Sequence, residues 1–321
     1  MSVTLKDLIG LTKELPEEYL KEAYESLKGI KEKAEAEKES KPVECPRCDS
    51  VKVVRNGKQN GRQFYLCKDC GKAFMETATS AIAHSHSGKT VWKQVIRDTV
   101  EGVSIDKTAE ALDLSHSTVF NMRHKILYCV EQAILNTPGV LEGVCEADET
   151  YVLESVKGRK ISEDYHRKPR KHGAKASKPG LSNEYICVCT SIDADNNCMT
   201  EAVNRAMPSD AEIARVFGDK VTSDTVILCD GSKRYDILEE KCTVAHTNRV
   251  NKVNGFHSFI KERLLAARGV ATIYLSRYTA LFSHVFGKQD VAVDKIYEMM
   301  TARNGSFSDI STVKSQSLLI L

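Results

Sequence analysis

The sequence lacks the features that place a protein in a membrane or send it for export. It contains no run of about 18 or more apolar residues, the length that a membrane-spanning helix needs. Charged residues interrupt the first stretch, MSVTLKDLIGLTKELPEEYL, where a signal peptide carries an unbroken apolar region. We therefore expect a soluble cytoplasmic protein with no membrane partner.

Net charge is also nearly lacking. Lys and Arg number 46 against 44 Asp and Glu, so the formal net charge is +2. The chain as a whole is not a polycation, and affinity for a polyanion must come from local basic patches. The length of 321 residues allows two or three domains of ordinary size.

The eleven cysteines fall into two groups. Seven lie among apolar residues, where a reduced thiol behaves as a small hydrophobe. The other four form two Cys-x-x-Cys pairs separated by 18 residues that alternate in the manner of short strands. Each pair can supply two thiolates to a tetrahedral zinc ion, and a site closed by four thiolates is structural. The expected ligands are Cys45, Cys48, Cys67 and Cys70.

Two other interpretations of these cysteines are four unrelated thiols and a redox Cys-x-x-Cys motif. No thioredoxin-like strand and helix follow either pair, which disfavours the redox motif. We expect a zinc ribbon over residues 43–80. Basic residues surround it, as either a DNA-contacting ribbon or a solvated one would show: Arg47, Lys52, Arg55, Lys58, Arg62, Lys68 and Lys72.

Three segments with helical periodicity occupy residues 88–137. Ser104 and Ser115 stand where helix N-caps belong, and LDLSHST is a short turn between the last two segments. The segment resembles a helix-turn-helix unit, whose second helix enters the major groove of DNA. The candidate DNA contacts on that helix are Ser117, Asn121, Arg123 and Lys125, with His116 and His124 beside them.

Strands and helices alternate in residues 138–300. Asp148 falls inside the expected strand GVCEADETYV, and Asp230 ends the apolar strand DTVILCDG. Buried, unpaired carboxylates are costly, and a bound cation is the simplest explanation for both. Residues 157–180 contain nine Lys or Arg. They form either a disordered solubilising loop or a flexible loop that closes on a nucleic-acid backbone, with contacts from Arg167, Lys168, Arg170 and Lys171.

The stretch VNGFHSFIK is helical in pattern and carries Asn254 and Lys261. Because these residues are seven apart, two helical turns bring them to nearly the same angular position. We expect His257 to pack or to contact DNA rather than to act as a general base, Glu149 to be structural, and Glu146 to be a reserve metal ligand on the face of Asp148.

Four stretches together resemble the insertion-sequence transposases that join a zinc ribbon and a helix-turn-helix to a ribonuclease-H-like catalytic domain. They are CPRC…CKDC, EADETYV, GLSNEYICVCTSID with ILCDG, and VNGFHSFIK with GVATIYLSRYTALF, within residues 43–286. The resemblance implies a multi-domain α+β chain. Its expected parts are a helical arm (1–42), the ribbon (43–80), the helix-turn-helix (88–137), the α/β ribonuclease-H-like domain (138–300) and a tail (301–321).

The resemblance also implies an activity. Such an enzyme binds terminal inverted repeats, cleaves DNA at the element ends and joins the 3′-hydroxyls to target DNA, as a homodimer or a larger assembly on double-stranded DNA. Two Mg²⁺ or Mn²⁺ ions stabilise the attacking and leaving oxygens of such a reaction. The implied ligands are Asp148, Asp230 and Asn254, with Lys261 on a phosphate. A prokaryotic copy would be associated with the nucleoid.

Two alternatives remain open at the level of sequence. Asn254 stands where many relatives carry a carboxylate, so the chain could be an inactive or domesticated DNA-binding regulator. A ribonuclease-H-type nuclease would share the metal site but would not need the ribbon and the helix-turn-helix. An amide oxygen still binds hard cations, which favours an active enzyme.

Overall fold

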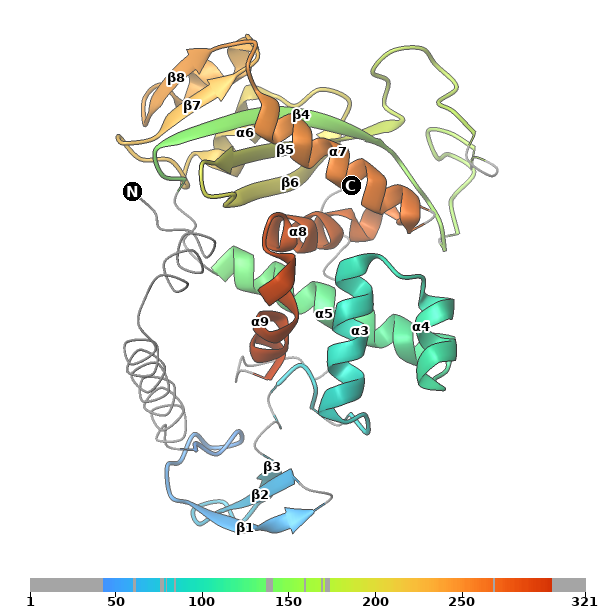
Figure 1. Cartoon of the computed structure of the whole chain (residues 1–321), viewed down its shortest axis with the longest axis vertical. Coiled ribbons are helices and arrows are strands. Elements are labelled where there is room, and N and C mark those ends of the chain that lie inside the picture. Colours follow the sequence, from blue (N-terminus) through green and yellow to red (C-terminus); the bar gives the residue numbers. More distant parts are fainter. Residues whose placement is uncertain are drawn as a thin grey trace, which may run out of the picture. The chain divides into compact units, whose positions relative to one another are not determined.

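A computed structural model describes residues 43–301 except 60–61, 76–77, 79, 84, 137–140, 159, 169, 171–173 and 268. The expected helical arm, Lys171 and the tail beyond residue 301 lie outside the described residues. The chain divides into two compact units, with the boundary between residues 78 and 79. Figure 1 shows the elements of both units.

The first unit contains a small antiparallel sheet of order β1-β2-β3. Its strands are β1 (Val53–Gln59), β2 (Arg62–Cys67) and β3 (Ala73–Met75). The two strands predicted between the cysteine pairs are confirmed, and β3 is an addition. Tyr65 and Phe74 stack with ring centroids 5.9 Å apart beside the buried Cys45 and Cys67. So small a core is typical of a module that needs a metal for stability.

The second unit begins with the three helices predicted from periodicity. They are α3 (Lys89–Glu101), α4 (Ile105–Leu112) and α5 (His116–Asn136). The Ser104 hydroxyl accepts the Lys107 amide at the start of α4, and the Ser115 hydroxyl accepts the Thr118 amide at the start of α5. Both predicted N-caps are therefore confirmed.

A five-stranded mixed sheet of order β6-β5-β4-β7-β8 follows. The strands β4, β5 and β6 pair antiparallel, while β7 and β8 continue from β4 in parallel. Their bounds are β4 (Val144–Leu153), β5 (Tyr185–Asp193), β6 (Cys198–Arg205), β7 (Val226–Cys229) and β8 (Thr243–His246). The strands GVCEADETYV and DTVILCDG correspond to β4 and β7. The alternating stretches NEYICVCTSID and NCMTEAVN predict β5 and β6 as a pair, and β8 is new.

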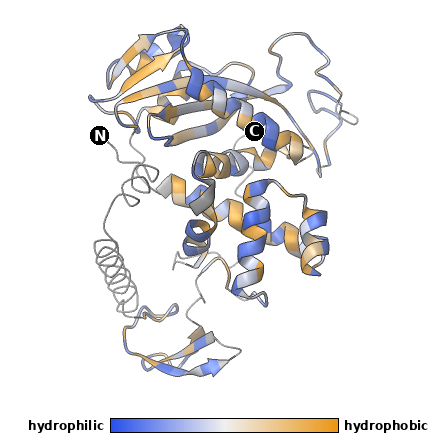
Figure 2. Ribbon diagram, viewed as in Figure 1, coloured by the Kyte–Doolittle hydropathy of each residue, from blue (hydrophilic) through white to orange (hydrophobic). Residues whose placement is uncertain are grey.

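Helices cover both faces of the sheet, which gives three layers (Figure 1). On one face α6 (Asp210–Phe217) and the 3₁₀ helix η1 (Lys233–Leu238) cover an apolar cluster that includes Cys145, Ala147 and Ile227. On the other face α7 (Asn251–Ala266) and α8 (Leu275–Val285) cover Ile186 and Val188. Figure 2 shows hydrophobic and hydrophilic residues interleaved along the helices, as such packing requires.

The helix α8 belongs to two cores at once. Its Phe282 packs towards the sheet, whereas Leu281 and Val285 join the core formed by α3, α5 and α9 (Gln289–Thr301). Arg277 of α8 is buried and pairs with Glu131 of α5 at 3.1 Å. The residues expected as separate domains, 88–137 and 138–300, therefore lie in one compact unit with a shared helical core.

Candidate functional site

The sheet brings Asp148 and Asp230 to neighbouring positions on one face. In the parallel pair of β4 and β7, Glu146 lies opposite Leu228. Asp148 lies two residues further along β4, and Asp230 follows directly after the end of β7. Continued alternation places both on the face that α7 covers. Neighbouring strands thus supply one carboxylate each.

Burial controls the chemistry of Asp148. Its side chain is 17% exposed, and this burial raises its pKa to about 6. A backbone hydrogen bond from Glu149 opposes the shift, the charge of Asp230 adds to it, and Lys261 opposes it. A carboxylate disfavoured in this way gains most from a cation placed beside it.

Helix α7 is anchored to β4 by Glu146. No side chain of α7 itself caps the helix, but one oxygen, Glu146 Oε2, accepts the backbone amides of Lys252 at 2.6 Å and Val253 at 3.0 Å. These are amides of the first helical turn, which have no partner inside a helix. Glu146 therefore caps α7. The sequence analysis predicts a reserve metal ligand at this position and does not predict the cap.

The side chains of Asn254, His257 and Lys261 follow one stripe of α7, three and four residues apart. Asn254 and Lys261 are exposed, as an open site requires. The Lys261 charge opposes the raised pKa of Asp148 and adds to the lowered pKa of His257. Asn254 and Lys261 both lie on α7 as expected, and the shared orientation of their side chains stays a prediction.

His257 lies against Asp148. Its Nδ1 is 3.6 Å from Asp148 Oδ2, and the residue is 4% exposed. Burial lowers the pKa of His257 to about 4, and Lys261 adds to the shift, so the ring is neutral at pH 7. His257 packs in the core as expected, and it also touches the candidate site. His257 lies four residues after Val253 and three before Ile260, and this spacing is what predicts its burial from the sequence.

Glu149 points to the opposite face of β4, towards the cluster under α6 and η1. Burial raises its pKa, and the charges of Asp148 and Asp230 add to the shift. This placement agrees with the structural role expected for it.

The four cysteines of the ribbon converge. Their sulfur atoms all lie within 4.8 Å of one another, with Cys45 and Cys70 3.6 Å apart and Cys48 and Cys67 also 3.6 Å apart. A tetrahedral zinc ion with Zn–S bonds of about 2.3 Å requires sulfur separations of about 3.8 Å. The geometry and the ligand type support a structural zinc ion.

The candidate DNA contacts of α5 divide by exposure. Ser117 is exposed, and Asn121 and Lys125 are half-buried. Arg123 is instead 6% exposed and donates to the Val103 carbonyl at 2.8 Å. Arg123 therefore links α5 to the turn after α3, and its guanidinium is buried instead of facing solvent. Arg123 lies four residues after Val119 and three before Ile126, a spacing that places it on the buried stripe of α5.

The basic loop between β4 and β5 is tied to two buried carboxylates. The Glu154 side chain is fully buried and binds Arg167 at 2.9 Å, Arg205 at 2.7 Å and His166 at 3.0 Å. Glu184 binds Arg170 at 2.8 Å. Arg167 and Arg170 thus order the loop, and contact with DNA would require these ion pairs to open. Lys168 is exposed.

Among the described residues, no helix is long and apolar enough to cross a bilayer.

Comparison with known proteins supports the class indicated by the motifs. A zinc-ribbon family model described as the InsA N-terminal domain matches residues 40–71, which include the four cysteines. A protein described as an uncharacterized protein in transposable element ISH50, from Halobacterium salinarum, is 24% identical over 254 residues. The match covers 75% of this chain and 84% of that protein. The first match covers the ribbon alone, and the second relates most of the chain to a protein of a transposable element.

A solved structure, a pre-cleavage Mos1 transpososome, is similar over 70% of this chain and 77% of its own chain. The sequences are 12% identical and the TM-score is 0.27. A score of this size does not establish a shared fold.

Proposed function

We propose that the chain is an active DNA transposase of the Asp-Asp-Asn type. It would bind the terminal inverted repeats of its element, cleave DNA at the element ends and join the 3′-hydroxyls to target DNA. The observation that carries the proposal is the meeting of β4, β7 and α7. Asp148 and Asp230 lie at neighbouring positions on one face of the sheet, His257 of α7 lies 3.6 Å from Asp148, and Asn254 and Lys261 flank His257 on the same helix.

The donor set fits divalent cations that prefer oxygen. Asp148 and Asp230 offer carboxylates and Asn254 an amide oxygen, which are ligands of the kind that Mg²⁺ and Mn²⁺ take. When bound, such ions stabilise charge on the attacking and leaving oxygens of a phosphoryl transfer. The buried Asp148, whose burial disfavours its charge, supports this assignment.

The side chains around the metal ligands have separate tasks in this proposal. Lys261 would hold a phosphate oxygen of the DNA as a point charge. His257 is neutral and buried, so it would fix the position of the Asp148 carboxylate rather than carry a proton. Glu146 would hold the start of α7 on β4 and thereby set the position of Asn254.

A ribonuclease-H-like fold for residues 138–300 is part of the same proposal. Three antiparallel strands continued by two parallel strands, with helices on both faces, are compatible with that fold. Strands β4 and β7 are neighbours in this order, which a site built from the two carboxylates requires.

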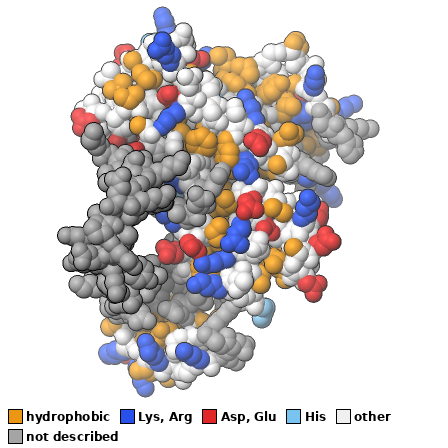
Figure 3. Space-filling model, in the orientation of Figure 1, with side chains coloured by type: hydrophobic (Ala, Val, Ile, Leu, Met, Phe, Trp, Pro, Cys, Tyr) orange, Lys and Arg blue, Asp and Glu red, His pale blue; other side chains and the backbone are white. Residues whose placement is uncertain are grey.

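Recognition of the element ends is assigned to α4 and α5, as a helix-turn-helix, and to the zinc ribbon. The exposed start of α5, with Ser117 and the half-buried Asn121 and Lys125, supports entry into the major groove. Exposed Lys and Arg side chains gather on the ribbon unit (Figure 3) and support contact with phosphates. Two ends joined in one reaction require at least a homodimer on DNA.

Strand transfer of a labelled terminal-repeat duplex in Mg²⁺ or Mn²⁺ tests the proposal. Loss of a metal ligand should slow joining at least about 100-fold, because even residues that only orient ligands contribute 10- to 100-fold. We expect this for Asp148→Ala, Asp230→Ala and Asn254→Ala. Asn254→Asp keeps an oxygen ligand and should retain activity.

Asp219→Ala is the matched control, because that carboxylate is 93% exposed and pairs with Lys241. Joining by Asp148→Ala at the wild-type rate would refute the catalytic site. End binding by the wild type without any joining would point instead to a DNA-binding regulator. Cleavage without preference for the element ends would point to a nuclease.

A further inference from the structure

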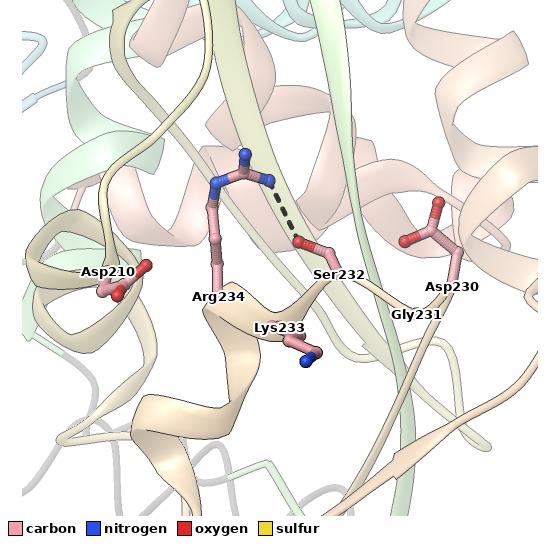
Figure 4. A pocket seen from close by; sticks show the side chains of 6 residues that line it. All are labelled: Asp210, Asp230, Gly231, Ser232, Lys233 and Arg234. Carbon is pink, nitrogen blue, oxygen red and sulfur yellow. Dashed lines mark hydrogen bonds between the residues drawn. The ribbon is translucent and has the colours of Figure 1, made fainter.

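A shallow pocket of about 490 Å³ opens beside Asp230. It is built mainly from the chain that follows β7, and its lining consists of Asp210, Asp230, Gly231, Ser232, Lys233 and Arg234. Figure 4 shows the Arg234 guanidinium bonded to Ser232, with Lys233 on the same stretch of chain and Asp210 on α6. The two cations of the pocket therefore lie three and four residues after a candidate metal ligand.

Gly231 makes this arrangement possible. Its φ of +92° lies in the region that residues with a side chain rarely adopt, and no atom lies within 4 Å of where its Cβ would be. The chain turns sharply here, so that Ser232, Lys233 and Arg234 line the same pocket as Asp230.

Arg234 is half-buried and has few protein partners. Its NH1 donates to the Ser232 hydroxyl at 3.1 Å, and its NH2 contacts the Met207 sulfur at 3.6 Å. Among the described residues it has no carboxylate within 4.0 Å. A guanidinium offers five N–H donors that suit a carboxylate or a phosphate, and a partly desolvated one without such a partner is unfavourable.

Neutralisation of Glu149 is the competing role for Arg234. The Arg234 charge does act on Glu149, but burial of Glu149 outweighs it and the pKa of that carboxyl stays raised. Asp210 is acidic and lies in the first turn of α6, where a negative charge is favourable. An anion in the pocket would therefore lie on the side of Lys233 and Arg234.

We propose that Ser232, Lys233 and Arg234 form a second phosphate-binding subsite, which holds a non-reacting phosphate of the DNA strand beside the catalytic centre. The inference rests on the proposed function, because it takes DNA as the substrate. Arg234 would bind the phosphate in a bidentate manner and Lys233 as a point charge. The subsite would position the strand so that the reacting phosphate meets Asp148 and Asp230.

The test is a methylphosphonate scan of the terminal-repeat duplex with the full-length chain, read as binding affinity. Each duplex carries one neutral linkage in place of a phosphate. We expect one linkage near the cleavage position to weaken wild-type binding about 10- to 100-fold, the range of a hydrogen bond to a charged group. Arg234→Gln should weaken binding to the unmodified duplex by the same factor and be insensitive to that linkage.

Two further variants make the result specific. Lys233→Gln should reduce the slope of log affinity against log salt by about one phosphate contact. Arg215→Gln is the matched control, since Arg215 is an exposed arginine of the same unit paired with Glu201, and it should leave the scan unchanged. Far-UV circular dichroism and the thermal midpoint verify that each variant is folded. If Arg234→Gln does not fold, Lys233→Gln provides the test.

Identical scans for the wild type and Arg234→Gln would overturn the subsite, as would equal losses in Arg234→Gln and Arg215→Gln. The binding scan does not depend on joining activity. A wild type that binds ends but never joins them would therefore refute the proposed catalysis, whereas an unchanged scan in an active enzyme would refute only the subsite.

Discussion

Removing the carboxylate of Glu146 should loosen the start of α7. Each hydrogen bond to a charged group contributes about 1.5–3 kcal/mol, and loss of a helix N-cap costs about 0.5–2 kcal/mol. Glu146 Oε2 makes two such bonds, to amides that lack other partners in the helix. Because the two contributions overlap, we expect Glu146→Ala to lower the free energy of unfolding by about 2–4 kcal/mol. Glu146→Gln keeps an acceptor oxygen and should cost about 1 kcal/mol.

Urea denaturation followed by circular dichroism measures this difference. Glu142→Ala is the matched control, because Glu142 is exposed just before the same strand and should change stability by less than about 0.5 kcal/mol. Both Glu146 variants should also slow strand transfer without weakening end binding, since α7 carries Asn254 and Lys261. Equal stabilities for Glu146→Ala and Glu142→Ala would show that the cap does not anchor the helix.

Three other outcomes follow from the structure. Cys67→Ser should remove bound zinc, measured by metal analysis, and abolish end binding, while the unfolding transition of residues 79–321 persists. Loss of that unfolding transition together with end binding would contradict an autonomous ribbon. Gly231→Ala should cost about 1–2 kcal/mol because of its positive φ, whereas Gly255→Ala inside α7 should stabilise by up to about 1 kcal/mol; thermal melts compare them. Glu154→Gln should cost about 3 kcal/mol at pH 7 by leaving buried cations unpaired.

The Glu154 variant also has a defined pH dependence. Burial alone would raise the pKa of Glu154, but hydrogen bonds from Tyr165 and Arg205 and nearby positive charges hold it below its ordinary value. A carboxyl with a lowered folded-state pKa contributes stability above its unfolded pKa and loses it as the pH falls through the folded pKa. The stability gap between wild type and Glu154→Gln should therefore narrow below about pH 4. A gap that stays constant down to pH 3 would contradict this account.

Local patterns in the sequence predict much of this structure. The spacing of the cysteines predicts their convergence, because a tetrahedral ion needs two tight pairs. Helical periodicity predicts α3, α4 and α5 together with the caps at Ser104 and Ser115. Alternation predicts that Asp148 and Glu149 leave β4 on opposite faces.

Other features depend on contacts between distant residues, which local patterns do not contain. Glu146 meets α7 across 106 residues of sequence, so its role as a cap is invisible in EADETYV. Arg167 was expected among DNA contacts because it lies in a basic run, but the buried Glu154 thirteen residues earlier attracts it. Strand β8 has four residues and no apolar run, and pairing with β7 alone defines it.

The core shared by α3, α5, α8 and α9 would fix the distance along DNA between the bound repeat and the cleaved bond. Arg263 near the end of α7 donates to the Glu101 carbonyl at the end of α3, so α7 is fixed to a helix of the shared core as well as to the sheet. In a complex of the proposed kind, a set number of base pairs would separate the bound repeat from the cleaved bond. Five extra base pairs, about half a turn of B-DNA, would carry that bond to the far side of the duplex.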